Sequence, residues 1–579
     1  MKSISGRMAE RTSRQFKVVG GMAESIKESL VSTYLVPEIP TKPTAEPKTV
    51  YTVASGDLRL ATNVKTWDMQ QQVEREFAAA LNQLGWQVKR AHGVDPAKGH
   101  GFIDNQRRGM NVFAGIPAEA PLVVIEAVWQ YSHHVLAGLR DHQGPILLAA
   151  NFAGDFPGLV GMANLHGSMT KATIPHSTIW SKDFTDDWAK AKLDEWLSTG
   201  AIVHDTSHVR DLPELPPSAE KQLGEALAAE LKAKKAILAV FDEGCMGMYN
   251  AIIDDELLNP AGIYKERLSQ SALVAEMNKV TEDEAAAVRA WLDDAGMTFH
   301  VDNDGDWKEN LTDAQLTSQF KMYIAALRIA DDFGADAVGI QYQQGLKDMV
   351  PASDLAEGLL NNVERPPVCS REGDRVLFPG LAMPHFNEVD EGVAVDAVVT
   401  NRVWTAMGLD PATTLHDVRW GDDWEGDFVW VLEISGSVPA SHLGGYDKAH
   451  SYRQSYYYFP LGGGTLSGVS KPGEIVWSRV FIMDGRLHVD LGRGTCIEMP
   501  EAEVQRRLNS TNKEWPIMNA ILHGVTRDQL MARHKANHIN VAYAPDAATA
   551  DAALVAKAAM FKAMGYDVHL AGEVLTNLA

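Results

Sequence analysis

Short apolar runs of strand length recur through the first two thirds of the chain. Pro121–Trp129 and Pro145–Phe152 are largely apolar, and Ala236–Phe241 and Ala337–Gln341 repeat the pattern farther along. Continuous hydrophobicity, as opposed to strict alternation, is typical of strands buried on both faces of a parallel sheet. These runs predict two sets of parallel strands, the second opening at Ala236.

Helical spacing alternates with these strands. Residues 73–84 carry apolar side chains at intervals of three and four, and Gly85 ends that pattern. Thr312 and Gln315 match a capping box ahead of a long apolar helical face, and Gly334 follows it. Alternating strands and helices favour α/β layers.

The pattern changes in the last third of the chain. Phe428–Ile434 and Glu474–Met483 are rich in β-branched and aromatic residues. Asp484 and Gly485 offer a tight hairpin turn before Arg486–Leu491. One helix near the C-terminus is predicted within this β-rich region.

These patterns predict an α/β fold with two α/β layered domains on parallel sheets and a β-rich, barrel-like C-terminal domain. Residues 1–48 are predicted to be an extension: a helix over Thr12–Leu35, then a proline-rich linker. The predicted domains that follow are 49–235, 236–400 and 401–579.

Charge narrows the range of partners. The 579 residues carry a formal net charge of −23, from 76 acidic and 53 basic residues. Such a surface repels nucleic acid and anionic membranes, so we expect neither as a partner. No apolar stretch approaches the length of a membrane span, and no secretory signal pattern is present.

Cysteine usage points to a reducing compartment. The three cysteines, Cys245, Cys369 and Cys496, are widely spaced and form no CxxC pair. We therefore expect a soluble, cytoplasmic protein that acts on a neutral molecule or binds cations.

Acidic and imidazole side chains in the last third are the candidates for chemistry. Glu388 precedes a predicted helix, and Asp417 follows a predicted strand. Taken alone, they are explained by an acidic first helical turn and a solvated acidic loop. His534 and His538 have the spacing of a zinc helix, but Lys535 replaces the glutamate of HExxH. Spacing alone supports an acidic α/β protein that binds a hard divalent cation.

Several segments resemble, in order, the L-fucose isomerase family and, more distantly, the L-arabinose isomerases. Asn387–Asp390 resembles the segment with the metal-binding glutamate, Asp417–Arg419 that with the aspartate, and Ala536–His538 that with the histidine. Asn509–Thr511, with Trp515 close behind, resembles a block upstream of the last ligand. The resemblance rests on the order and spacing of these motifs, because none is specific alone.

The resemblance implies a metal-dependent aldose–ketose isomerase acting on a free pentose or (deoxy)hexose. Glu388, Asp417 and His538 would hold Mn²⁺, or else Mg²⁺ or another divalent cation. Glu388 and Asp417 would also act as acid and base, moving a proton between C1 and C2 through an enediol.

Four further residues are implied as sugar contacts. Trp129 and Met246 would pack on the apolar face of the sugar, and Gln341 and Asn537 would bond its hydroxyl groups. The family builds its active site between the subunits of a hexamer, so we expect a homo-oligomer whose first domain caps a neighbour's site.

The chain also departs from the family pattern. Thr465 follows the glycine triplet where the family has an aromatic residue, residues 512–514 are additional, and residues 1–48 have no counterpart. Thr465 and the N-terminal extension favour, as an alternative, a metal-dependent lyase, epimerase or deglycosylating enzyme on the same scaffold. A non-catalytic sugar-binding protein is the third hypothesis, although a binder needs neither carboxylate.

Overall fold

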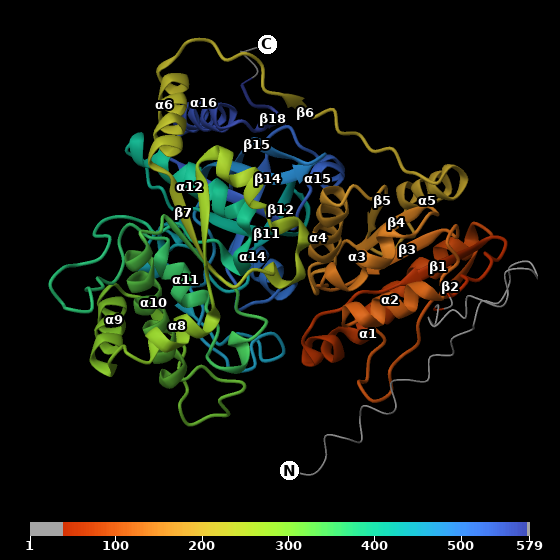
Figure 1. Cartoon of the computed structure of the whole chain (residues 1–579), viewed down its shortest axis with the longest axis horizontal. Helices are drawn as coiled ribbons and strands as arrows, with labels where there is room; N and C mark the ends of the chain where they lie inside the picture. The colour runs from red at the N-terminus through yellow and green to blue at the C-terminus, as the bar shows by residue number, and fades with distance from the viewer. Residues whose placement is uncertain (1–36, 38, 576–579) are drawn as a thin grey trace, which may run out of the picture.

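A computed structural model describes residues 37 and 39–575, so the helix predicted over Thr12–Leu35 lies outside the described residues. Figure 1 shows three groups of elements: the first parallel sheet with its helices in orange, a second group in green, and the C-terminal strands in blue. Two hydrophobic clusters join the C-terminal strands to the other two groups.

The first group is a five-stranded parallel sheet with the order β2-β1-β3-β4-β5. Its strands are β1 (Thr49–Val53), β2 (Gln87–Arg90), β3 (Leu122–Glu126), β4 (Ile146–Asn151) and β5 (Ser177–Ser181). Its helices are α1 (Leu60–Gln83), α2 (Gln106–Ala114), α3 (His133–Arg140), α4 (Gly158–Lys171) and α5 (Asp187–Thr199). Leu122 and Val124 pack with α2, α3 and α4, whereas Val123 and Ile125 pack with α1 and α5. Both faces of the sheet are buried, as the continuous apolar runs predicted.

The second group contains a three-stranded parallel sheet with the order β10-β7-β8. Its strands are β7 (Ala236–Phe241), β8 (Ile263–Leu268) and β10 (Ala337–Ile340). Its helices are α7 (Asp255–Leu258), α8 (Gln270–Met277), α9 (Glu282–Asp294), α10 (Asp313–Phe333), α11 (Asp354–Leu360) and α12 (Glu391–Ala406). The predicted capping box of α10 is confirmed, because Thr312 and Gln315 each accept a hydrogen bond from the other's backbone N–H. Gly334 ends α10 in the left-handed conformation, with φ of 61°.

The C-terminal third forms a closed antiparallel ring of six strands. Its strand order is β14-β17-β11-β12-β16-β15, and a pairing between β14 and β15 closes it. These strands are β11 (Thr414–Trp424), β12 (Asp427–Glu433), β14 (Gly473–Met483), β15 (Arg486–Cys496), β16 (Ile517–Leu522) and β17 (His538–Ala544). The predicted hairpin is confirmed: Asp484 and Gly485 have φ of 51° and 71° between β14 and β15.

Shorter elements surround the ring. The helices are α13 (Ala440–Leu443), α14 (Glu501–Asn509), α15 (Arg527–Arg533) and α16 (Ala547–Met564). Strand β18 (Asp567–Ala571) extends the sheet from β15, and β9 (Thr298–Phe299) pairs with β13 (His450–Ser451).

Residues 209–234, which the predicted boundary assigns to the first domain, pack with the C-terminal third. Strand β6 (Val209–Asp211) pairs with β18, and α6 (Ala219–Lys234) lies against α16, as Figure 1 shows. The helices approach closely: a Cβ on Gly224 would lie 2.2 Å from the carbonyl oxygen of Ala556. The apolar pattern of the sequence cannot predict this packing, because an amphipathic helix has the same pattern whichever element it packs against.

The mixed α/β architecture with parallel sheets and a β-rich C-terminal part is therefore confirmed. Among the residues described, no helix is long and apolar enough to cross a membrane.

Candidate active site

Strand pairing brings Asp417 and His538 together although they are far apart in sequence. Strands β11 and β17 run antiparallel, and their register places Asp417 opposite His538. Residues opposite each other on neighbouring strands have their side chains within reach. His538 Nε2 lies 3.4 Å from Asp417 Oδ1.

Glu388 approaches the same nitrogen of His538 from a strained loop. His385 bridges to Val338 of β10 as an added parallel edge, and the chain then turns toward α12. Glu388 and Val389 both have positive φ, of 57° and 58°. Such backbone is costly for a β-branched residue and is concentrated at functional sites. Glu388 Oε2 lies 3.6 Å from His538 Nε2.

Asp390 fixes the orientation of the imidazole. Its Oδ2 accepts a hydrogen bond from His538 Nδ1 at 2.7 Å and forms a salt bridge with Arg479 Nη1 at 2.6 Å. Its Oδ1 accepts from the first backbone N–H groups of α12. The proton of His538 is thus held on Nδ1, and the lone pair of Nε2 faces Glu388 and Asp417. That Nε2 atom is buried and has no hydrogen-bond partner.

Burial sets the protonation of the acids. It raises the pKa of Glu388 to about 7, against a lowering hydrogen bond from Ser435. It also raises the pKa of Asp417 to about 7, against the lowering effect of His538. Burial alone would raise the pKa of Asp390 too, but Arg479 and His538 hold it well below its usual range. Two acids near neutrality beside one fixed carboxylate are suited to proton transfer.

A small pocket opens on these groups, enclosing about 40 Å³. Its walls come from the first sheet, the second group and the ring: Arg59, Trp129, Pro157, Val160, Met246, Gln343, Glu388, Asp417, Arg419, Ser435, Tyr458, Phe459 and Trp515. The pocket is partly open, and the space inside it fits only a few water-sized groups. The first domain of the chain itself covers the pocket, whereas the sequence led us to expect the domain of a neighbouring subunit.

The predicted sugar contacts fare unevenly. Trp129 and Met246 line the pocket, and their packing against a sugar stays a prediction. Asn537 lies beside it, its amide nitrogen 3.4 Å from Asp417 Oδ1. Gln341 does not line the pocket, because its side chain turns back to accept a hydrogen bond from the backbone N–H of Gln343. Gln343 lines it instead, so the prediction was two residues early.

Sequence reasoning missed Arg59, which enters the pocket from the turn before α1. Asp57 binds its guanidinium through both carboxylate oxygens, at 2.8 and 2.6 Å. The Nη1 of Arg59 donates to the carbonyl oxygen of Tyr458 at 2.9 Å, linking the first domain to the C-terminal third. The Asp57-Leu58-Arg59 sequence gave a weak signal, since a carboxylate two residues before an arginine is common on surfaces.

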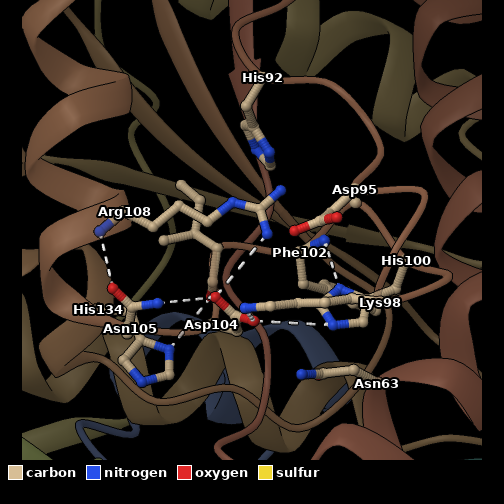
Figure 2. Close-up of polar contacts among 12 residues, drawn as sticks. Asn63, His92, Asp95, Lys98, His100, Phe102, Asp104, Asn105, Arg108 and His134 are labelled. Atoms are coloured by element: carbon tan, nitrogen blue, oxygen red, sulfur yellow. Dashed lines mark hydrogen bonds and ion pairs between the residues drawn. The ribbon is translucent and has the colours of Figure 1, made fainter. Parts of the chain in front are cut away.

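A neighbouring loop supports this turn, and Figure 2 shows its polar contacts. Lys98, His100 and Arg108 surround the carboxylate of Asp104, with His100 Nε2 and Arg108 Nη1 each 3.8 Å from it. The loop then bridges to the turn, where the backbone N–H of Gly56 donates to the carbonyl of residue 103 at 2.9 Å. The loop therefore buttresses the segment that carries Arg59.

The three predicted metal ligands, Glu388, Asp417 and His538, do not surround a common point closely enough to hold an ion as they stand. Within residues 37 and 39–575, no group of three or more His, Cys, Asp or Glu side chains is gathered closely enough to hold a metal ion. Their chemistry nevertheless fits one: two carboxylates and an imidazole lone pair with no other partner. Ligands about 2.1 Å from one ion lie about 3.0–3.5 Å apart, close to the two separations from His538 Nε2. Rotation of the Glu388 and Asp417 side chains toward a common ion would complete the set.

Comparison with known proteins does not assign the chain to a family. A scan against models of protein families finds no match, and a search of curated proteins finds no relative. The functional argument therefore rests on the residues and geometry above.

Proposed function

We propose that the chain is a metal-dependent aldose–ketose isomerase acting on a free pentose or (deoxy)hexose. One observation carries the proposal: Glu388 and Asp417 both approach the unpartnered nitrogen of His538 in a pocket with aromatic walls. The order of motifs that resemble the L-fucose isomerases supports the same reaction.

The two acids suit the proton movements that isomerisation needs. Burial raises the pKa of each carboxyl to about 7 without a metal ion, and a bound cation would favour the carboxylate form, which can take a proton. They stand on different elements, Glu388 on a loop and Asp417 on strand β11. A bound Mn²⁺ or Mg²⁺, held by Glu388, Asp417 and His538, would polarise the substrate carbonyl and stabilise negative charge on its oxygens.

The walls suit a neutral polyol. Trp129, Tyr458 and Trp515 offer ring faces for the C–H surfaces of a sugar. Arg59 and Gln343 offer hydrogen-bond donors for hydroxyl groups. The net charge of −23 also disfavours a highly anionic substrate.

The expected hexamer stays a prediction.

A sugar panel tests the proposal. Chelator-treated protein is reloaded with Mn²⁺, and ketose formation is followed for L-fucose, D-arabinose, L-arabinose and D-galactose. The proposal expects conversion of at least one aldose that Glu388→Gln abolishes. Glu391→Gln is the matched control, because Glu391 is also buried with a pKa raised to about 7, yet it pairs with Lys265 outside the pocket. Equal loss in both variants would contradict a specific role for Glu388.

A further inference from the structure

A second polar cavity lies near Glu388, between α11 and the ends of β11 and β12. It encloses about 20 Å³, the space of one water molecule or one ion. Asp354, Glu357, Asn361 and His385 line it. All four side chains are more than nine-tenths buried, with exposures of 3%, 2%, 5% and 8%.

Polar atoms in this lining lack hydrogen-bond partners. They are Asp354 Oδ2, both Glu357 carboxylate oxygens, Asn361 Oδ1 and His385 Nε2. The amide nitrogen of Asn361 donates to the carbonyl of Thr413, which leaves its oxygen as the free acceptor. So many unpaired buried atoms around one small cavity are costly unless something binds them all.

The charges are also uncompensated. Among the described residues, these carboxyls take part in one ion pair. It joins His385 Nε2 to Glu357 Oε1 at 3.0 Å, and its geometry is not that of a hydrogen bond. A carboxylate oxygen and an imidazole nitrogen 3.0 Å apart have the spacing of two ligands on one ion. Burial raises the pKa of Glu357 well above its usual range, against a lowering contribution from the hydroxyl of Ser353. Burial and the nearby Glu357 carboxyl do the same for the pKa of Asp354, against a lowering contribution from the amide of Gln454.

We propose that this cavity binds one divalent cation, with Glu357, His385 and the amide oxygen of Asn361 as ligands and Asp354 as a neighbouring negative charge. The amide is essential, because no three His, Cys, Asp or Glu side chains converge there or elsewhere in the described chain. Oxygen donors with one imidazole suit Mn²⁺. The ion ties α11 to the loop that leads to Glu388. The inference does not rest on the isomerase activity, because it uses different residues.

Mn²⁺ binding to the full chain tests the site. Equilibrium dialysis at pH 7.5 would compare wild type, Glu357→Gln, Glu388→Gln and the double variant. We expect two ions per chain in wild type, one in each single variant and none in the double variant. If the Glu388 centre fails instead, wild type binds one ion, which Glu357→Gln loses and Glu388→Gln keeps. Wild-type stoichiometry in Glu357→Gln would overturn the second site.

A measurement on the unaltered protein covers the case in which Glu357→Gln fails to fold. Anomalous diffraction at the manganese edge, from wild-type crystals grown with Mn²⁺, should place a peak between Glu357 and His385. Density for a water molecule there, with no anomalous signal, would overturn the proposal and leave the carboxyls neutral by protonation.

Discussion

A single carboxylate, Asp390, determines what His538 can do. It holds the imidazole proton on Nδ1, so Nε2 presents its lone pair to Glu388 and Asp417. Arg479 and the N-terminus of α12 keep Asp390 ionised. A carboxylate behind a metal-binding histidine usually raises ligand basicity and fixes the ring.

Asp390→Asn should therefore weaken Mn²⁺ binding by about 10- to 100-fold, since the amide can donate to Nδ1 and move the proton to Nε2. The substitution also breaks a buried salt bridge, which costs about 3–5 kcal/mol. Asp396→Asn is the control, because it breaks the buried pair between Asp396 of α12 and Lys557 of α16, and Asp396 makes no contact with His538. Both variants should melt earlier, but only Asp390→Asn should lose affinity by calorimetric titration. Equal affinity losses would refute the role of Asp390.

A buried row of Lys535, His166 and His176 predicts that acid lowers the stability of the fold. Lys535 Nζ lies 2.6 Å from His166 Nε2, and His166 Nδ1 lies 2.7 Å from His176 Nε2. Burial lowers the pKa of His176 to about 4, while the unfolded chain keeps about 6.5. Below pH 6.5 the unfolded state binds more protons, so stability falls as pH falls from 6.5 toward 4.

Because of His176, the free energy of unfolding should be about 1 kcal/mol lower at pH 5.5 than at pH 7. His176→Asn removes the titration, so its melting temperature should fall less than that of wild type between the two pH values. Identical falls in both proteins would show that His176 does not titrate in this way.

At the scale of elements, local patterns predicted more than long-range pairings. The parallel strands, the α10 capping box and the Asp484-Gly485 hairpin follow from side-chain periodicity and turn chemistry, both of which are local. The Asp417–His538 pair follows from the β11–β17 register, which periodicity does not fix; resemblance alone supplied those residues. Arg59 was missed because its importance lies in a contact with Tyr458, hundreds of residues away.

The turn between β1 and α1 offers a test at this scale. A Cβ on Gly56 would lie 2.5 Å from Phe102 Cβ and 2.7 Å from Asn63 Oδ1. Gly56→Ala should destabilise the fold by about 1–3 kcal/mol and shift Arg59, which raises KM more than it lowers kcat. Gly93→Ala is the control, because no atom lies within 4 Å of a Cβ there and its φ is ordinary. Thermal melting and kinetics would check both, and normal KM in Gly56→Ala would contradict the account.

At the scale of the whole molecule, the first domain closes over the pocket. Its contacts with the loop before β14 include Arg59 Nη1 to the carbonyl of Tyr458 and Thr62 Oγ1 to the carbonyl of Tyr457, at 2.9 and 2.8 Å. Because the pocket has only about 40 Å³ for water-sized groups, we expect these contacts to open when a ligand as large as a sugar binds.

Thr62→Val removes one of these contacts at nearly constant volume, a loss of about 1 kcal/mol. Amide hydrogen exchange around Tyr457 should accelerate by about fivefold if the closed state depends on that bond. Thr66→Val is the control, because Thr66 Oγ1 bonds only within α1, to the carbonyl of Thr62. Equal exchange in both variants would indicate that closure has another cause.

The most direct test of the central claim is proton NMR of the reaction in D₂O with the Mn²⁺-loaded protein. The sugar is the aldose that the panel finds to be converted, and Glu388→Gln and Asp417→Asn are the comparison proteins. The account predicts that solvent deuterium enters the sugar at the carbon that receives the proton, and that either substitution abolishes both exchange and conversion. Conversion that survives in both variants, or the absence of any exchange and conversion in protein with bound Mn²⁺, would contradict it.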